Sequence, residues 1–586
     1  MKLKGIGISG TISWGKVFLY LQESYSIPKY NVFDVSSEIN RFTNAINKTI
    51  EDINKIKQTL ETSLSNDELF LYTSFILFLN DPNFISLVTN EIKKGQKNAE
   101  WALYVVLEEL ISKFQNLPNI SFTQRSEDIS SIGEKIMMNL LTKQVNSEKL
   151  NIPPNSIIVA RSISPTDPII LEHKNIAGLI TELGGYASHT AIMTRSLSIP
   201  SVLGVEFITS IVQNDDELIL NPLTGEVILK PTEEEFKEAK ALQSKQKRLL
   251  ANFHPYTNKE SKTLDNVSID ILANIAFAEE IPSLLKTSAK GIGLYRSEFI
   301  VLQSNSFPPE ETQYKILKKI FSTIHPDKEI TIRTLDLGGD KIIPGYASAN
   351  EKNPFLGYRA IRFCLSRPKL FLEQIRSILR AAYNSKNLKI MIPMVSNYEE
   401  IIETKKLFKQ AIEELEKENI PFCKNFKLGI MFEIPSVYYI LDELAKEIDF
   451  ISIGTNDLIQ YILACDRGNE KVAYLFRYSN PSVLRFLNDT IKKANKLGLE
   501  VSMCGEMASD IYSIPLLLGM GLRRFSIPPS SFMLVNKLIN NISLKECEKL
   551  TNQILKLVST YEIEEKVNKW IKERAYEVYE FFHLLK

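Results

Sequence analysis

Several polar side chains follow apolar, strand-like segments in the second half of the sequence, each at the point where a segment ends. Loops usually favour Ser, Asn, Asp and Gly, whereas these positions include arginines, a glutamate and a cysteine. Parallel strands bring their carboxyl ends to one edge of a sheet, where active sites are built. The pattern therefore favours an active site formed by these residues: Arg296, Arg333, Glu433, Asn456, Asp457, Cys504 and Glu506.

The charged members of this set suit a phosphorylated acid as substrate. Arg296 and Arg333, with Arg467 further along the chain, offer planar donor forks that match carboxylate and phosphate oxygens. Glu433 and Asp457 could together hold a hard cation such as Mg²⁺ beside the substrate oxygens. A metal ion and arginines around a phosphorylated acid are the usual means of phosphoryl transfer.

Cys504 lies between Met503 and Gly505 and allows two interpretations. A thiol at this position could act as a general acid. It could equally be a small, inert core residue. The residues alone do not choose between these two roles.

A second candidate is the segment GGYASHTAIMTR, residues 184–195. Its two glycines allow a tight turn, and the apolar run after His189 predicts the start of a helix. The first amides of that helix, with Ser188 and Thr190, could receive an anion attached to His189, and neutral imidazole is a competent nucleophile. A histidine that merely caps a helix is the alternative, and both stay open. The remaining histidines have no comparable setting: His173, His254, His325 and His583.

The elements that must position the strand-end residues begin after Val267. Stretches of helical periodicity, such as residues 398–415 and 481–497, separate eight strand-like segments. Eight strands alternating with helices predict a (β/α)8 barrel, whose carboxyl-terminal mouth would gather the polar residues. The eight segments are SIDILANI, KGIGLYRSE, EITIRTLDL, LKIMIPMVS, FKLGIMFEI, IDFISIGTN, LEVSMCGEM and RRFSIPP.

The first half of the chain has a different pattern. Residues 5–20 predict a strand or hairpin with Gly10 and Gly15 at turns, and short β-rich segments return between 155 and 230. Helical periodicity between these regions predicts about four helices. We therefore expect a helical block inserted into a small α/β domain. Helical patterns occur at residues 39–60, 69–79, 101–114 and 132–141.

The composition argues against several classes of protein. Seventy basic residues balance seventy acidic ones, which is unlike a globally basic nucleic-acid binder or a polybasic membrane protein. The five cysteines show no metal-ligand spacing and are too sparse for a disulfide framework. No run of about 18 apolar residues is present, and the N-terminus lacks the apolar core of a signal peptide. We expect a cytoplasmic protein without membrane insertion and without a nucleic-acid partner.

Two segments resemble the signatures of one family. GGYASHTAIMTRSLSIPSVLG is similar to the phosphohistidine signature of the phosphoenolpyruvate (PEP)-utilising enzymes, and IDFISIGTNDLIQYILACDRGN is similar to their second, barrel-borne signature. In length and domain order the whole chain resembles the Enzyme I branch of this family, from the bacterial sugar phosphotransferase systems. The resemblance is weakest in the helical block.

The resemblance implies a role for each matching residue. His189 matches the phosphorylated histidine, and Cys504 matches the acid that protonates the enolate carbon, which is one of the two roles left open above. Glu433 and Asp457 match ligands of Mg²⁺. The positions that match PEP-binding residues or lie near that pocket are Arg296, Arg333, Arg359, Asn456, Asp457 and Arg467.

The implied reaction transfers the phosphoryl group of PEP to His189 and then to the small carrier protein HPr, and it releases pyruvate. In the family the helical block docks HPr and the barrel forms a homodimer. The predicted domains are a phosphohistidine α/β domain (1–20 and 146–230), a helical HPr-binding block (21–145), a linker helix (231–260), the barrel (261–576) and a short tail (577–586).

Three alternatives share the signatures or the scaffold. Pyruvate phosphate dikinases and PEP synthases need a large nucleotide-binding domain, but the residues before the histidine domain contain no Walker-type loop. The nitrogen-related branch usually adds an N-terminal sensory domain, for which we expect no room here. A catalytically inactive regulatory protein is the third alternative, and the presence of every chemical group at once argues against it.

Overall fold

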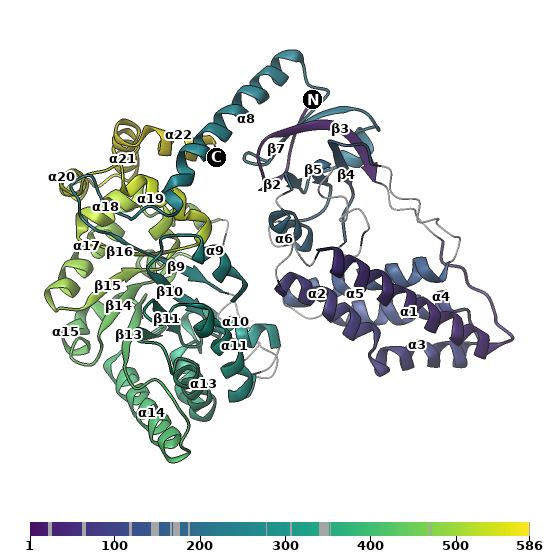
Figure 1. Cartoon of the computed structure of the whole chain (residues 1–586), viewed down its shortest axis with the longest axis horizontal. Coiled ribbons are helices and arrows are strands. Elements are labelled where there is room, and N and C mark those ends of the chain that lie inside the picture. The colour runs from purple at the N-terminus through teal and green to yellow at the C-terminus, as the bar shows by residue number, and fades with distance from the viewer. Residues whose placement is uncertain are drawn as a thin grey trace. The chain divides into compact units, whose positions relative to one another are not determined.

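The structure, a computed structural model, describes most of the chain, and the described residues form two compact units (Figure 1). The first unit is Met1–Arg248 with Phe582–Lys586, and the second is Leu249–Phe581. The described residues are 1–20, 26–60, 66–115, 120–141, 152–164, 167, 176–185, 188–197, 199–276, 278–304, 307–338, 351, 353–467, 469 and 471–584.

The first unit is built on an eight-stranded sheet with the order β1-β8-β7-β3-β4-β5-β6-β2. Strands β3 to β6 pair in parallel, and the outer strands pair antiparallel. Gly10 has a φ of +93° and bends the chain after β2, whereas Gly15 lies inside β3 and not at the predicted turn. A side chain at Gly15 would collide with the Asn155 carbonyl. The strands are β1 (Lys2–Lys4), β2 (Ile6–Ser9), β3 (Ser13–Tyr20), β4 (Ser156–Ala160), β5 (Ile176–Thr181), β6 (Ser201–Leu203), β7 (Glu217–Asn221) and β8 (Glu226–Leu229).

Five helices lie between the parallel neighbours β3 and β4, which is the predicted insertion with one helix more than expected. The additional helix is α3, where Asp81 caps the first turn, Pro82 follows it, and Phe84, Val88 and Ile92 are buried at a spacing of four residues. The helices are α1 (Val35–Leu60), α2 (Asn66–Leu79), α3 (Pro82–Gly95), α4 (Ala99–Gln115) and α5 (Ile120–Leu140).

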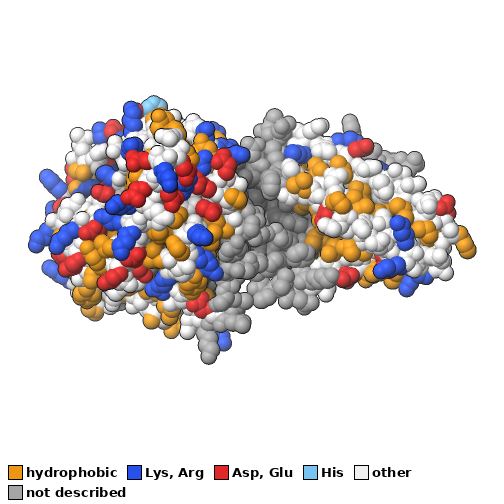
Figure 2. Space-filling view, turned by 90° about the horizontal axis from the view of Figure 1, so that it is seen from below, with side chains coloured by type: hydrophobic (Ala, Val, Ile, Leu, Met, Phe, Trp, Pro, Cys, Tyr) orange, Lys and Arg blue, Asp and Glu red, His pale blue; other side chains and the backbone are white. Residues whose placement is uncertain are grey.

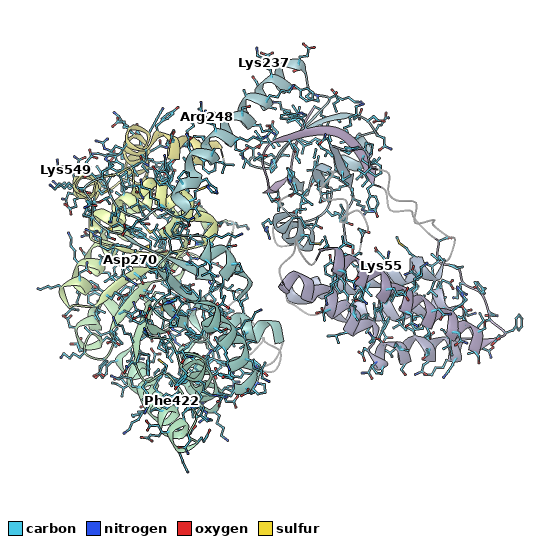
Figure 3. The ribbon with its side chains drawn as sticks, in the orientation of Figure 1. Lys55, Lys237, Arg248, Asp270, Phe422 and Lys549 are labelled. Atoms are coloured by element: carbon cyan, nitrogen blue, oxygen red, sulfur yellow. The ribbon has the colours of Figure 1, made fainter. Side chains whose placement is uncertain are left out.

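Three further helices of the described residues lie between β5 and the barrel in the sequence. Helix α6 (His189–Ser196) precedes β6, and α7 (Ile208–Ile211) follows it. Helix α8 (Glu233–Phe253) forms where the polar connecting stretch predicts a helix, and Lys237 and Arg248 both lie on it (Figure 3). Gln243 Nε2 donates to the Ile12 carbonyl (2.6 Å), which attaches the first part of α8 to the first unit.

The second unit contains the predicted barrel. Its eight strands are all parallel and close in the order β10-β11-β12-β13-β14-β15-β16-β9. Each of the eight strand-like segments forms one strand, so the fold class is confirmed. The strands are β9 (Asp270–Ile275), β10 (Gly291–Arg296), β11 (Glu329–Arg333), β12 (Leu388–Ile392), β13 (Phe426–Phe432), β14 (Phe450–Ile453), β15 (Glu500–Met503) and β16 (Arg524–Ile527).

Helices connect the strands and extend past the last one. They are α9 (Ile281–Leu285), α10 (Glu298–Ser304), α11 (Glu310–Thr323), α12 (Ile361–Ser366), α13 (Pro368–Ala381), α14 (Tyr398–Lys417), α15 (Leu441–Leu444), α16 (Thr455–Leu463), α17 (Pro481–Lys496), α18 (Ser513–Met520), α19 (Phe532–Ile539), α20 (Leu544–Ile554), α21 (Thr560–Arg574) and α22 (Tyr576–Leu584).

The two ends of the barrel differ in chemistry. Buried apolar side chains fill part of the interior, including Leu294, Met391 and Phe450. At the amino ends of the strands, Arg524 pairs with Asp270 (2.6 Å) and Glu329 (2.6 Å). This ion-pair network lies at the amino-terminal end of the barrel. The residues predicted to form the active site lie at the opposite, carboxyl-terminal end.

The C-terminal residues predicted as a tail contribute to α22. Within the second unit, Phe581 packs edge-on against Phe253 of α8 with ring centroids 5.0 Å apart, and Lys537 pairs with Glu577 (2.9 Å). The predicted domain boundaries remain a prediction, because residues 21 and 146 fall outside the described part of the chain. His173 lies outside it as well.

The surface carries charges of both signs. On the face in Figure 2, blue and red side chains are interspersed over the unit Leu249–Phe581, in keeping with the zero net charge. Among the described residues, no helix combines the length and the apolar character that a membrane span requires.

Candidate active site

The barrel places most of the predicted site residues at the carboxyl ends of neighbouring strands. Arg296 and Arg333 are the last residues of β10 and β11. Glu433 directly follows β13, Cys504 directly follows β15, and Asp457 lies in the first turn of α16, just after β14. Since all these strands are parallel, their ends meet in one mouth.

Two arginines in this mouth are bound to buried carboxylates. Arg333 pairs with Glu298 and, through Nη1, with Asp336 (3.1 Å). Arg359 grips Asp336 through Nε (2.8 Å) and Nη2 (3.0 Å), and Nη2 also reaches Asp457 (3.1 Å). We call these five residues the mouth cluster. Every member is at least nine-tenths buried.

The mouth cluster keeps both guanidiniums charged. Burial alone would lower the pKa of Arg333, but the carboxylates of Glu298 and Asp336 outweigh burial and raise it. Burial likewise opposes the charge of Arg359, and the contacts with Asp336 and Asp457 raise its pKa. Paired guanidiniums of this kind can stay buried because each charge has a hydrogen-bonded partner.

Glu433 lies beside the mouth cluster, where its ionised form is disfavoured. It is 1% exposed, and one of its oxygens accepts a hydrogen bond from the Met394 amide (2.7 Å). Burial and the neighbouring carboxylates of Asp457 and Asp336 raise the pKa of Glu433 to about 8. The carboxylates of Glu433 and Asp457 repel one another, and a cation bound by both would relieve this repulsion.

The carboxylates in this buried region suit a divalent cation. Four carboxylates and two guanidiniums lie together here among the described residues. The carboxylate oxygens of Glu433 and Asp457 are the donors that Mg²⁺ prefers, so these residues fit the predicted metal. No cluster of three or more candidate ligands is found in the described part of the chain. The six groups are Arg333, Arg359, Glu298, Asp336, Glu433 and Asp457.

The remaining polar residues line the more open part of the mouth. Asn456 Nδ2 donates to Glu506 (2.9 Å), and the Glu506 amide donates back to Asn456 Oδ1 (3.1 Å). Arg467 lies 3.6 Å from Glu506 and is exposed. Arg296 is partly buried at its strand end. The Arg467 amide donates to Gln460 (3.2 Å), and its side chain forms an exposed ion pair, which is a weak interaction.

Cys504 belongs to the interior of the barrel and borders this mouth. Its thiol is buried with Leu294, Met391, Met431 and Phe450. Burial raises the pKa of the Cys504 thiol above its usual value, and the charge on Arg333 opposes this rise only in part. The thiol is consequently protonated at neutral pH, which is the state that a proton donor needs.

In the first unit, the structure places His189 as the first residue of α6; its side chain lies outside the described part of the chain. Ser188 caps this helix by accepting a hydrogen bond from the Ala191 amide (3.3 Å). Gly184 has a φ of +118°, which favours glycine before the helix. The Thr190 hydroxyl is buried and donates to the Ile163 carbonyl (2.8 Å), so its proton is engaged there and not with an anion on His189, the role that the sequence suggests for it.

Sequence reasoning did not single out two members of the mouth cluster. Glu298 lies two residues after Arg296, and Asp336 lies three residues after Arg333. Both stand just past strand ends, which is the same signal that identified the other residues. Their importance becomes visible only through their contacts with Arg333 and Arg359.

Comparison with known families finds matches along most of the chain. The family described as PEP-utilising enzyme, PEP-binding domain, matches residues 251–544. The mobile domain of PEP-utilising enzymes matches residues 152–225, and their N-terminal domain matches residues 4–125. The three matches together include both the barrel mouth and the segment around His189.

Curated relatives match over nearly their whole length. The chain is 36% identical over 572 residues to a phosphoenolpyruvate-protein phosphotransferase of Listeria innocua, with 98% of this chain and 100% of the relative covered. Proteins of the same name from Staphylococcus carnosus and Staphylococcus epidermidis are 34% and 36% identical over 574 residues, with 97% of this chain and 99% of each relative covered.

Proposed function

The chain belongs to the family of PEP-utilising enzymes, and on that premise we propose how its residues carry out the reaction of a phosphoenolpyruvate–protein phosphotransferase. It is a transferase that takes the phosphoryl group of PEP, releases pyruvate and serves a bacterial sugar phosphotransferase system. The observation that carries the assignment of residues is the mouth cluster, in which buried guanidiniums and carboxylates meet beside Glu433 and Cys504.

PEP binds at the barrel mouth in this proposal. Arg296, Arg333 and Arg467 neutralise its phosphate and carboxylate, with Asn456 and Arg359 beside them. Support comes from Arg333 Nε, which is buried and has no hydrogen-bond partner among the described residues. A substrate oxygen would satisfy this donor, because an unpaired buried N–H is costly.

Glu433 and Asp457 hold Mg²⁺ in this proposal. The ion would neutralise the negative charge of the phosphate and of the developing enolate oxygen. The carboxylates of Glu433 and Asp457 support this assignment, because oxygen donors favour a hard divalent ion. The protein's own part is to keep both carboxylates close together at the end of the barrel.

His189 is the nucleophile. One ring nitrogen attacks the phosphorus, the bond between phosphorus and the enolate oxygen breaks, and that oxygen keeps the electron pair. The enolate carbon then takes the proton of the Cys504 thiol, which yields pyruvate, and the thiolate regains a proton from water. The buried, protonated state of the Cys504 thiol supports this role.

Phosphorylated His189 then passes its group to the carrier protein HPr, which docks on the helical block. Because His189 and the barrel residues belong to different compact units, the reaction requires His189 to visit both the barrel mouth and HPr, and α8 is the connecting arm. We further propose a homodimer formed through the barrel and a cytoplasmic location.

Release of pyruvate in the absence of any acceptor tests this scheme. Mixing the chain with PEP and Mg²⁺ but without nucleotide should release a burst of pyruvate that stops at one equivalent per active chain, since His189 accepts a single phosphoryl group. Rapid quenching followed by pyruvate determination measures the burst. A chain that releases no pyruvate, or that needs a nucleotide to do so, would exclude the proposed function.

A further inference from the structure

We propose that Asp336 is a positioning residue, a shared carboxylate that sets the places of Arg333 and Arg359 for PEP. The inference rests on the proposed function, because it concerns how the same mouth recognises its substrate. It adds a residue that touches neither the substrate nor the metal in the scheme above.

The contacts of Asp336 are the first reason. Its Oδ1 accepts from Arg359 Nε (2.8 Å) and its Oδ2 accepts from Arg359 Nη2 (3.0 Å). This two-point grip fixes both the distance and the plane of the Arg359 guanidinium. The same Oδ2 lies 3.1 Å from Arg333 Nη1, so a single carboxylate determines how far apart the two arginines lie.

The charges in the cluster are the second reason. Arg333 and Arg359 repel one another, since the charge of Arg359 acts to lower the pKa of Arg333. A carboxylate that pairs with both of two buried like charges offsets their repulsion, and removing such a partner is costly. Asp336 is 1% exposed and is such a carboxylate. Glu298 contacts Arg333, and Asp457 contacts Arg359, but Asp336 pairs with both.

The length of the side chain is the third reason. Asp336 lies beyond the end of β11 and reaches both guanidiniums through one methylene group. A glutamate would keep the charge but would be longer by about 1.5 Å, one carbon–carbon bond. A displacement of about 1 Å in a group that binds substrate can cost on the order of 100-fold in catalytic efficiency.

Asp336→Glu therefore tests the position of the carboxylate apart from its charge, because the variant moves the carboxylate and keeps the charge. The assay follows single-turnover labelling of the chain by ³²P-PEP with Mg²⁺ at a series of PEP concentrations. We expect the half-saturating PEP concentration to rise by about tenfold or more, with the maximal rate little changed, because the arginines bind charges present in both ground state and transition state. A barrel that was merely destabilised would lower the labelled fraction without moving the half-saturating concentration.

Glu310→Asp is the matched control. Glu310 also bridges two arginines, Arg376 (2.7 Å) and Arg380 (2.5 Å), but it lies on α11, among the outer helices. Its change in length should leave the half-saturating PEP concentration as in the unmodified chain. Asp336→Asn is the second variant, because it keeps the length and loses the charge, and it should raise the half-saturating concentration as well.

The outcomes distinguish a failure of the positioning role of Asp336 from a failure of the proposed function. If the unmodified chain takes no label, the proposed function fails and the role of Asp336 fails with it. If the unmodified chain is labelled but both Asp336 variants have its half-saturating concentration, only the positioning role is overturned. An equal rise of the half-saturating PEP concentration in Glu310→Asp would also overturn the positioning role, since the effect would then not be specific to residues of the barrel mouth.

Discussion

Cys504 shows how one residue type takes its role from its surroundings. The described chain contains other buried thiols, at Cys364, Cys423, Cys465 and Cys547. Cys504 differs from these because it follows β15 at the mouth, where the charges of both Arg333 and Glu433 act on the pKa of its thiol. A buried thiol with a raised pKa holds its proton until a stronger base, such as an enolate carbon, is formed beside it.

Replacement of this thiol tests its role. Cys504→Ala should lower the rate of pyruvate formation from PEP by about 100-fold to 10,000-fold, the usual contribution of a general acid. Cys547→Ala removes a thiol that is equally buried, in α20, and should leave the rate nearly unchanged. Rapid-quench measurement of pyruvate compares the two variants. A rate for Cys504→Ala close to that of the unmodified chain would show that another group supplies the proton.

The sequence could predict single site residues but not their pairing. Arg333, Glu433, Asp457 and Cys504 are recognisable because each follows an apolar strand segment. The bond between Arg359 and Asp457 joins residues 98 positions apart, and no local pattern indicates it. Only the folded barrel therefore shows which arginines are held by carboxylates and which are available to a substrate.

At the scale of the elements, Asp265 joins the start of the barrel to a helix near its end. Its carboxylate accepts hydrogen bonds from the amides of Leu544 (2.9 Å) and Lys545 (3.1 Å), at the first turn of α20. Burial acts to raise the pKa of Asp265, but hydrogen bonds from Thr263 and these amides outweigh it and lower the pKa. Asp265 thus stabilises the N-terminus of a helix distant in sequence.

The lowered pKa gives a prediction with a defined sign. Asp265→Ala should lower the stability of the barrel at pH 7 by about 1 to 2 kcal/mol, as for a lost helix cap. Because the pKa is lower in the folded chain, this contribution is complete above the unfolded value of about 3.9 and is lost as the pH falls further. Urea denaturation of both chains from pH 7 down to pH 3 measures the difference. A difference that did not shrink below about pH 4 would contradict the assignment.

The elements themselves were largely predictable from the sequence. All eight barrel strands are short, largely apolar runs, and each forms where the pattern predicts it. Helix α3 was not predicted, because its buried stripe consists of only Phe84, Val88 and Ile92. Strand β6 is three residues long and too short for periodicity to show. Long, regular elements were therefore found, and the shortest patterns were not.

At the scale of the whole molecule, the chemistry is divided between two compact units. The segment around His189 lies in the first unit, and the mouth cluster lies in the second. In the proposed reaction neither unit is sufficient alone, because the barrel binds PEP and the other unit carries the phosphoryl group away. PEP alone, without a nucleotide, should therefore phosphorylate His189.

Labelling with ³²P-PEP measures this phosphorylation. The unmodified chain, incubated with ³²P-PEP and Mg²⁺ without nucleotide, should take up acid-labile label, as a phosphohistidine does. His189→Ala should take up none, whereas His325→Ala, which changes an exposed histidine of the barrel unit, should be labelled like the unmodified chain. Absence of label in the unmodified chain, or undiminished label in His189→Ala, would contradict the account.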